Sequence, residues 1–174
     1  INIDERIIPA TLIATDPLND LAIIKGDFTP QTIFYLNPST PELLDDIYVA
    51  GYPFGYAISS SIKITKGIIS SLSGIGNNFS NMQIDAAIQP GNSGGPIFDK
   101  QGAIVGVATG GIDKKVILDE DGFIPDGINY GVSTERILRF LKENQKTKKS
   151  SYQYDAATLY KYMRSAVVFI VAQE

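Results

Sequence analysis

One serine near the middle of the chain stands in an unusual setting. Ser93 lies between Gly91-Asn92 and the pair Gly94-Gly95, with strand-like apolar runs on both sides. Glycines around a hydroxyl let a substrate carbonyl approach the backbone closely, so that amide N–H groups can hold its developing negative charge. The segment Gly91-Asn92-Ser93 is therefore the expected oxyanion hole, with the amides of Gly91 and Ser93 as its donors. We predict that Ser93 is a nucleophile rather than a residue of an ordinary glycine-rich turn.

The groups that activate such a serine are only partly present. Asp20 stands at the entry to the apolar run Leu21–Lys25, where a carboxylate can accept the Nδ1–H of a histidine and orient it. Asp16 and Asn19 are competing turn residues, but only Asp20 directly precedes the strand. The 174 residues contain no histidine, which is the usual base. The chain thus has the composition of a serine hydrolase that lacks one member of its triad.

Composition argues against several other classes of protein. The formal net charge of −4 does not favour binding to nucleic acid. The absence of cysteine and histidine excludes disulfides and the common zinc sites. The acidic loop 113–126 lacks the ligand spacing of an EF-hand, so we expect a solvated loop, no metal and no organic cofactor. The longest apolar run, Ala166–Ala172, is too short to span a bilayer.

The elements that must position these residues are mostly strands. Short apolar runs alternate with turn residues along the chain, which favours an all-β protein. A helical pattern begins clearly only at Thr134–Asn144, where Ser133 or Thr134 can cap the start. Six short strands followed by one helix predict a closed barrel with the helix packed on it. The expected strands are 7–14, 21–25, 46–53, 61–72, 82–88, 95–98, 103–108 and 128–132, with turns at 16–20 and 99–102.

Several motifs in order resemble one known family. The sequence from about residue 5 to residue 144 is similar to trypsin-like serine proteases, and within them to the HtrA/Deg branch. The motifs that carry the resemblance are Thr15–Lys25 (TDPLNDLAIIK), Gly51–Gly55 (GYPFG), Thr65–Ser70 (TKGIIS), Gln83–Pro96 (QIDAAIQPGNSGGP), Gly102–Val107 (GAIVGV) and Asn129–Val132 (NYGV). The resemblance implies a chymotrypsin-like double β-barrel with its active site between the barrels. It also implies that Asp20 is the orienting acid, Ser93 the nucleophile and Gly91 the main oxyanion donor.

The same resemblance sets the expected domain organisation. Residues 1–27 are the closing strands of an incomplete first barrel, 28–45 the connection, and 46–144 the second barrel with its helix. Residues 145–154 form a linker, and 155–174 resemble the helix and first strand that open such a domain. The tail then begins a tandem domain, exchanges into another copy, or marks a permuted chain, unless it simply caps a barrel edge. The missing histidine belongs on a strand before Ile1.

Two departures from the digestive trypsin-like enzymes refine the expected activity. Residue 92 is Asn rather than the Asp that pairs with a new N-terminus after zymogen cleavage, so Ile1 is not such a terminus. Ala87, six residues before Ser93, stands where the floor of the primary pocket is expected, so we predict cleavage after small or medium aliphatic residues. The substrate pocket implied by the resemblance comprises Ala87, Ile88, Gln89, Val107, Ala108 and Thr109.

The leading hypothesis is a serine endopeptidase that acts on peptides or unfolded proteins through an acyl-enzyme. The alternative is a non-catalytic trypsin-fold module that binds extended peptides along a sheet edge, with the histidine lost. A third hypothesis is that a partner chain supplies the histidine. Family resemblance suggests an extracytoplasmic location. The partners left open are a tandem or exchanged second protease domain or a homo-oligomer. We also expect apolar side chains of the first barrel to need further strands or a partner; they are Leu12, Ile13, Ile23 and Ile24.

Overall fold

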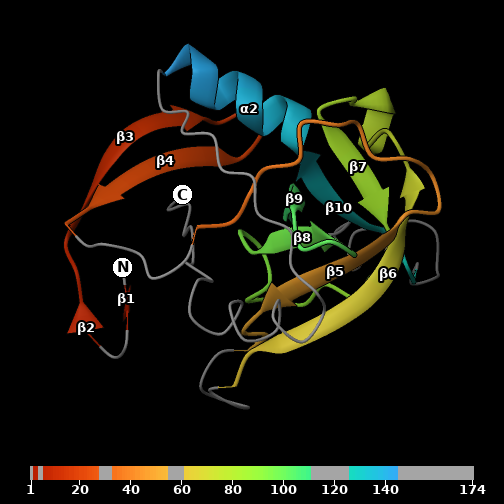
Figure 1. Ribbon diagram of the computed structural model, residues 1–174, viewed down its shortest axis with the longest axis horizontal. Helices are drawn as coiled ribbons and strands as arrows, with labels where there is room; N and C mark the ends of the chain where they lie inside the picture. The colour runs from red at the N-terminus through yellow and green to blue at the C-terminus, as the bar shows by residue number, and fades with distance from the viewer. Residues whose placement is uncertain (1, 4–5, 28–32, 55–60, 111–125, 145–174) are drawn as a thin grey trace, which may run out of the picture.

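The computed structural model describes residues 2–3, 6–27, 33–54, 61–110 and 126–144. Most of this part of the chain is β-structure, arranged as two small sheets and one closed barrel with a helix across it (Figure 1). The expected linker 145–154, the tail 155–174 and nearly all of the acidic loop 113–126 lie outside the described residues. No helix in the described ranges is long and apolar enough to cross a membrane.

The closed barrel contains six antiparallel strands in the order β10-β7-β6-β5-β8-β9. β9 also pairs with β10, which closes the barrel and leaves no free edge. Apolar side chains from five of the strands, β5 to β9, face a common core that includes Ile47, Val49, Ile69, Ile84 and Ile97. The strands are β5 (Asp46–Gly51), β6 (Lys63–Ser71), β7 (Asn81–Ile84), β8 (Pro96–Asp99), β9 (Ile104–Ala108) and β10 (Asn129–Ser133).

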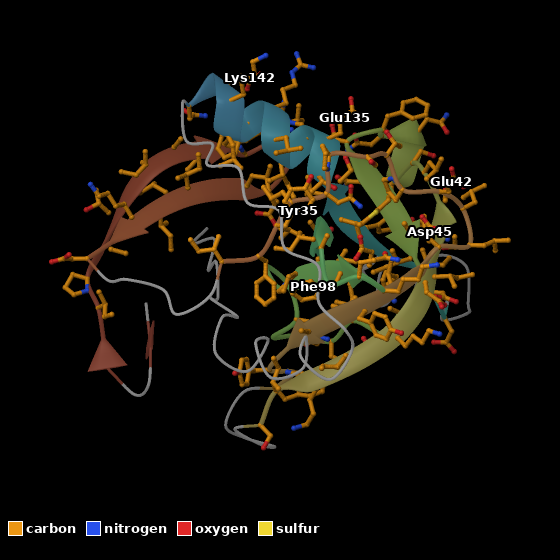
Figure 2. All side chains as sticks on the ribbon, viewed as in Figure 1. Tyr35, Glu42, Asp45, Phe98, Glu135 and Lys142 are labelled. Atoms are coloured by element: carbon orange, nitrogen blue, oxygen red, sulfur yellow. The ribbon has the colours of Figure 1, made fainter. Side chains whose placement is uncertain are left out.

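Helix α2 (Thr134–Glu143) follows β10 directly and lies against the barrel. Its N-cap is Ser133, and the buried Thr134 hydroxyl donates to the Val105 carbonyl of β9 at 2.7 Å. Ile137 and Phe140 are buried on its inner face. Figure 2 shows Glu135 and Lys142 pointing outward, an acidic residue in the first turn and a basic one in the last, as the helix dipole favours.

Two short hairpins precede the barrel. β1 (Asn2–Ile3) pairs with β2 (Arg6–Ile7), and β3 (Ala10–Asp16) pairs with β4 (Leu21–Gly26) around a turn at 17–20. In Figure 1 the turn end of the hairpin, where β3 ends and β4 begins, lies near α2. The opposite end of the hairpin extends away from the barrel. Within the described residues β3 and β4 pair only with each other, and Leu12 is 60% exposed.

The predicted fold class is confirmed: an all-β protein with a closed barrel and a C-terminal helix. The limits of most expected strands differ by one or two residues, and two strands differ more. The strand expected at 7–14 divides around Pro9, which has no N–H to donate to a ladder. The strand expected at 82–88 ends at Ile84, because the Asp85 side chain accepts from the Ile68 amide at 2.6 Å in place of a backbone carbonyl.

Candidate active site

Ser93 lies in a turn over residues 90–94 between β7 and β8, and it is exposed. Two backbone hydrogen bonds lie within this turn. The Asn92 amide donates to the Gln89 carbonyl at 2.9 Å, and the Gly95 amide donates to the Asn92 carbonyl at 2.9 Å. The turn is therefore a fixed structure that presents one hydroxyl to solvent.

The segment that follows β5 holds the other side of the turn. The Tyr52 amide donates to the Gly91 carbonyl at 3.3 Å, and the Phe54 amide donates to the Pro90 carbonyl at 2.8 Å. Gly91 has φ of +103°, and a Cβ atom there would lie 2.4 Å from the Tyr52 carbonyl oxygen. Both the conformation and the close approach therefore require glycine at position 91.

Asn92 points inward and is only 2% exposed. Its side chain lies against Gly51, where a Cβ atom would be 2.6 Å from the Asn92 Oδ1. Among the described residues that oxygen has no hydrogen-bond partner. The neutral amide of the residue next to Ser93 thus occupies a buried, closely packed site against Gly51.

Two amides of the loop remain without an acceptor. In the ranges the structure describes, neither the Gly91 amide nor the Ser93 amide donates a hydrogen bond, whereas the Asn92 amide is used within the turn. Of the three residues predicted to form the oxyanion hole, Gly91 and Ser93 are therefore the ones whose N–H groups are open to a ligand. An oxyanion needs two such donors.

The residues expected to form a substrate pocket come from two segments beside this loop. The Gly94 amide donates to the Ala108 carbonyl at 2.7 Å, and the Ala108 amide donates to the Gly95 carbonyl at 2.8 Å, so the end of β9 is joined to the serine loop. On the other segment, the Ala87 carbonyl accepts from the Thr65 hydroxyl at 3.0 Å. Ala87 and Gln89 are exposed, Ile88 packs on the core, and Val107 and Thr109 are half-buried.

Asp20 ends the β3–β4 turn, in a different sheet from Ser93. It is exposed, and its φ of +53° is unusual for a residue with a side chain. No hydrogen bond among the described residues joins Asp20 to Ser93. An acid that orients a histidine does not itself contact the nucleophile, so this separation is compatible with the predicted role.

Sequence reasoning treated Asp16 only as a turn residue and did not single out Arg136. In the structure the Asp16 carboxylate forms an ion pair with the Arg136 guanidinium of α2. Burial raises the pKa of Asp16, but hydrogen bonds from Arg136 and Asn19 and the charge of Arg136 outweigh it, so the pKa is lowered overall. The two residues are 120 positions apart, and no local pattern links them.

A hollow of about 390 Å³ lies elsewhere on the barrel, at the segment before β5 that carries Glu42 and Asp45 (Figure 2). Its lining also includes Asp46, Asp99 and Lys100. In the part of the chain that is described, no group of three or more histidine, cysteine or acidic residues has an arrangement that would hold a metal ion.

Comparison with known proteins identifies one family. Residues 1–107 match the family described as trypsin-like peptidase domain. The uncharacterized protein y4bJ of Sinorhizobium fredii is 34% identical over 134 residues, which are 77% of this chain and 21% of that protein. Serine endoprotease DegS of Escherichia coli is 33% identical over 135 residues, which are 74% of this chain and 36% of that protein.

A solved structure agrees with these sequence matches. The serine endoprotease from Yersinia pestis superposes with a TM-score of 0.63 at 29% identity, covering 83% of this chain and 47% of that one. The chain therefore spans 21% and 36% of these two curated relatives and less than half of the solved one.

Proposed function

Because this chain belongs to the trypsin-like peptidase family, in its HtrA/Deg branch, we propose that the whole protein is a serine endopeptidase with Ser93 as its nucleophile. The observation that carries the proposal is the serine loop. Gly91 has a positive φ, and Asn92 is closely packed in the fold. Two amides beside the exposed Ser93 hydroxyl make no hydrogen bond among the described residues, so they can serve as an oxyanion hole for the substrate carbonyl.

The reaction assigns a role to each residue. A histidine from outside these 174 residues accepts the Ser93 hydroxyl proton as the Ser93 Oγ bonds to the scissile carbonyl carbon. The amides of Gly91 and Ser93 hold the oxyanion, and Asp20 orients the histidine. The C–N bond then breaks, the histidine proton passes to the leaving amine, and water hydrolyses the acyl-enzyme by the same steps in reverse order.

The substrates are peptides or unfolded proteins with a small or medium aliphatic residue before the cleaved bond. Ala87 supports this specificity because it is exposed at the expected pocket floor and offers no carboxylate to an Arg or Lys side chain. We expect kcat/KM of the full-length protein to be higher for Ala, Val or Leu at this substrate position than for Arg. The Ala87→Asp variant should shift the preference toward Arg. A wild-type preference for Arg would contradict the assigned pocket.

The test of the activity itself is the intact mass of the full-length protein before and after treatment with a fluorophosphonate probe. The expected result is one adduct in the wild type and none in Ser93→Ala. The 174-residue chain alone should react far more slowly, because loss of one triad member leaves only about 10³–10⁴-fold catalysis over water. A full-length protein that gains no adduct would overturn the proposal.

One observation favours a second function: the absence of histidine from all 174 residues. Without a histidine from another segment or chain, the same loop and sheet edge would serve a pseudoprotease that binds extended peptides. The two functions separate in one comparison. A pseudoprotease binds a peptide but gains no Ser93-dependent adduct, whereas the endopeptidase does both.

A further inference from the structure

The proposed acid and nucleophile come from two different parts of the fold. Asp20 ends the turn of the β3–β4 hairpin, and Ser93 belongs to the closed barrel. A triad requires these two parts to keep a fixed relative position, because misplacement by about 1 Å can cost about 10²-fold in rate. Something must therefore hold the hairpin turn against the barrel.

The contact that does this joins the hairpin to α2. Arg136 in the first turns of the helix pairs with Asp16, the last residue of β3. Among the described residues no other side-chain hydrogen bond or ion pair connects this hairpin to α2. The side chain of Arg136 is 20% exposed and that of Asp16 is 10% exposed, so water screens the pair much less than a surface pair.

Asp16 also determines the shape of the turn that carries Asp20. Its Oδ2 accepts from the Asn19 side-chain amide at 2.8 Å, and its Oδ1 accepts from the Asn19 backbone amide at 3.3 Å. Asn19 is 7% exposed and directly precedes Asp20. The backbone direction at Asp20 thus depends on Asn19, which in turn depends on Asp16.

On its other side, α2 is joined to the serine loop through β9. The Thr134 hydroxyl bonds to Val105, and Ala108 at the end of the same strand exchanges hydrogen bonds with Gly94 and Gly95. The Thr134 bond is buried, and strand β9 with its backbone hydrogen bonds makes up the rest of this path. Together they form one frame from Asp16 to the residue next to Ser93.

The arrangement at Arg136 does not favour stability as its main role. Its Nε is buried and has no hydrogen-bond partner among the described residues, which is a cost to the folded state. Buried ion pairs often contribute little net stability but do specify one geometry. We propose that Arg136 and Asp16 are positioning residues that hold the Asp20 turn in register with Ser93. This inference rests on the proposed peptidase function.

The experiment compares two arginines of α2 in the full-length protein. Arg136→Met removes the buried pair, whereas Arg139→Ala removes an exposed pair with Glu143 and serves as the matched control. We expect kcat to fall about tenfold or more in Arg136→Met with KM nearly unchanged, partial rescue in Arg136→Lys, and wild-type values in Arg139→Ala. Asp16→Asn alone should lower kcat at least as much as Arg136→Met, because it weakens the contact with Arg136 and removes an acceptor of Asn19 together.

Amide hydrogen exchange at residues 19–21 provides a reading that needs no activity. Exchange should be faster in Arg136→Met than in the wild type and in Arg139→Ala. An active wild type whose Arg136→Met variant keeps its kcat, or whose loss of kcat comes without faster exchange at this turn, would overturn the positioning role alone. A wild type that neither cleaves nor gains a Ser93 adduct would overturn the proposed function, and the positioning role with it.

Discussion

The backbone at Gly91 decides how Ser93 meets a substrate carbonyl. A side chain at this position would face two separate difficulties, the positive φ of +103° and a carbonyl oxygen 2.4 Å from the Cβ position. Gly76 shares only the first, with φ of +63° and no heavy atom within 4 Å of its Cβ position. Comparing alanine variants of Gly91 and Gly76 therefore shows how much the close approach of Tyr52 adds to the cost of a positive φ.

We expect Gly91→Ala to abolish labelling of Ser93 and to destabilise the fold by more than Gly76→Ala does. A side chain in the left-handed helical region, where Gly76 lies, costs about 1–2 kcal/mol. The φ of +103° at Gly91 lies beyond that region, and the displaced Tyr52 segment adds a further cost in Gly91→Ala alone. Urea unfolding monitored by circular dichroism gives both values. Equal losses in the two variants would mean that the loop relaxes away from Tyr52 without cost.

A second prediction at the residue scale concerns Asn92, whose buried Oδ1 accepts no hydrogen bond among the described residues. Burial should raise the pKa of an Asp introduced there, so Asn92→Asp should be destabilised most at neutral and high pH. The deficit, about 3 kcal/mol or more, should shrink as pH falls and the carboxyl becomes neutral. Asn78→Asp is the control, because Asn78 is exposed and its Oδ1 accepts from the Ser80 amide. Equal stability of Asn92→Asp at pH 7 and pH 4 would reveal a cation beside residue 92.

At the scale of elements, the Asp16–Arg136 pair makes the contact between hairpin and helix dependent on pH. The pKa of Asp16 in the folded protein is lowered from its ordinary value of 3.8: burial alone would raise it, but the hydrogen bonds from Arg136 and Asn19 and the charge of Arg136 outweigh burial. A lowered folded pKa contributes stability that is present above 3.8 and lost as pH falls through the folded value.

We therefore expect wild type to be more stable than Asp16→Asn at pH 7, with the difference shrinking as pH falls below 3.8 and through the lowered folded pKa of Asp16. Urea unfolding at a series of pH values measures it. The same series on Glu143→Gln provides the control, since its exposed pair with Arg139 should contribute almost nothing at any pH. A difference between wild type and Asp16→Asn that stays constant across this range would show that the charge of Asp16 is not involved.

The elements that local sequence patterns specify were the ones that could be predicted. Short apolar runs between turn residues indicated the strands of the barrel, and a cap at Ser133 or Thr134 marked the start of α2, where the structure has Ser133. The serine loop was recognisable because its glycines are adjacent in sequence. The Asp16–Arg136 pair and the packing of Asn92 on Gly51 could not be predicted, because each joins residues that only the closed barrel and its helix bring together.

At the scale of the whole molecule, the described structure contains a closed barrel and two small open sheets, of which β3–β4 is the larger. The barrel has no free edge, whereas β3 and β4 pair only with each other in the described ranges. Leu12 is 60% exposed and Ile13 is 39% exposed on that sheet. Unpaired strand edges that carry exposed apolar side chains are sites of association. This open sheet is where we expect further strands, or another chain, to bind.

The 174-residue chain produced alone should therefore self-associate at micromolar concentration, and Leu12→Lys should shift it toward monomer, because a lysine on an edge strand opposes pairing. Phe79→Lys is the matched control: it removes an apolar side chain that is 78% exposed, but in the loop before β7 and outside the open sheet. Sedimentation velocity distinguishes the cases. A wild-type chain that sediments as a single monomer and melts cooperatively would contradict the prediction. Equal dissociation by the two variants would place the association surface elsewhere than on β3 and β4.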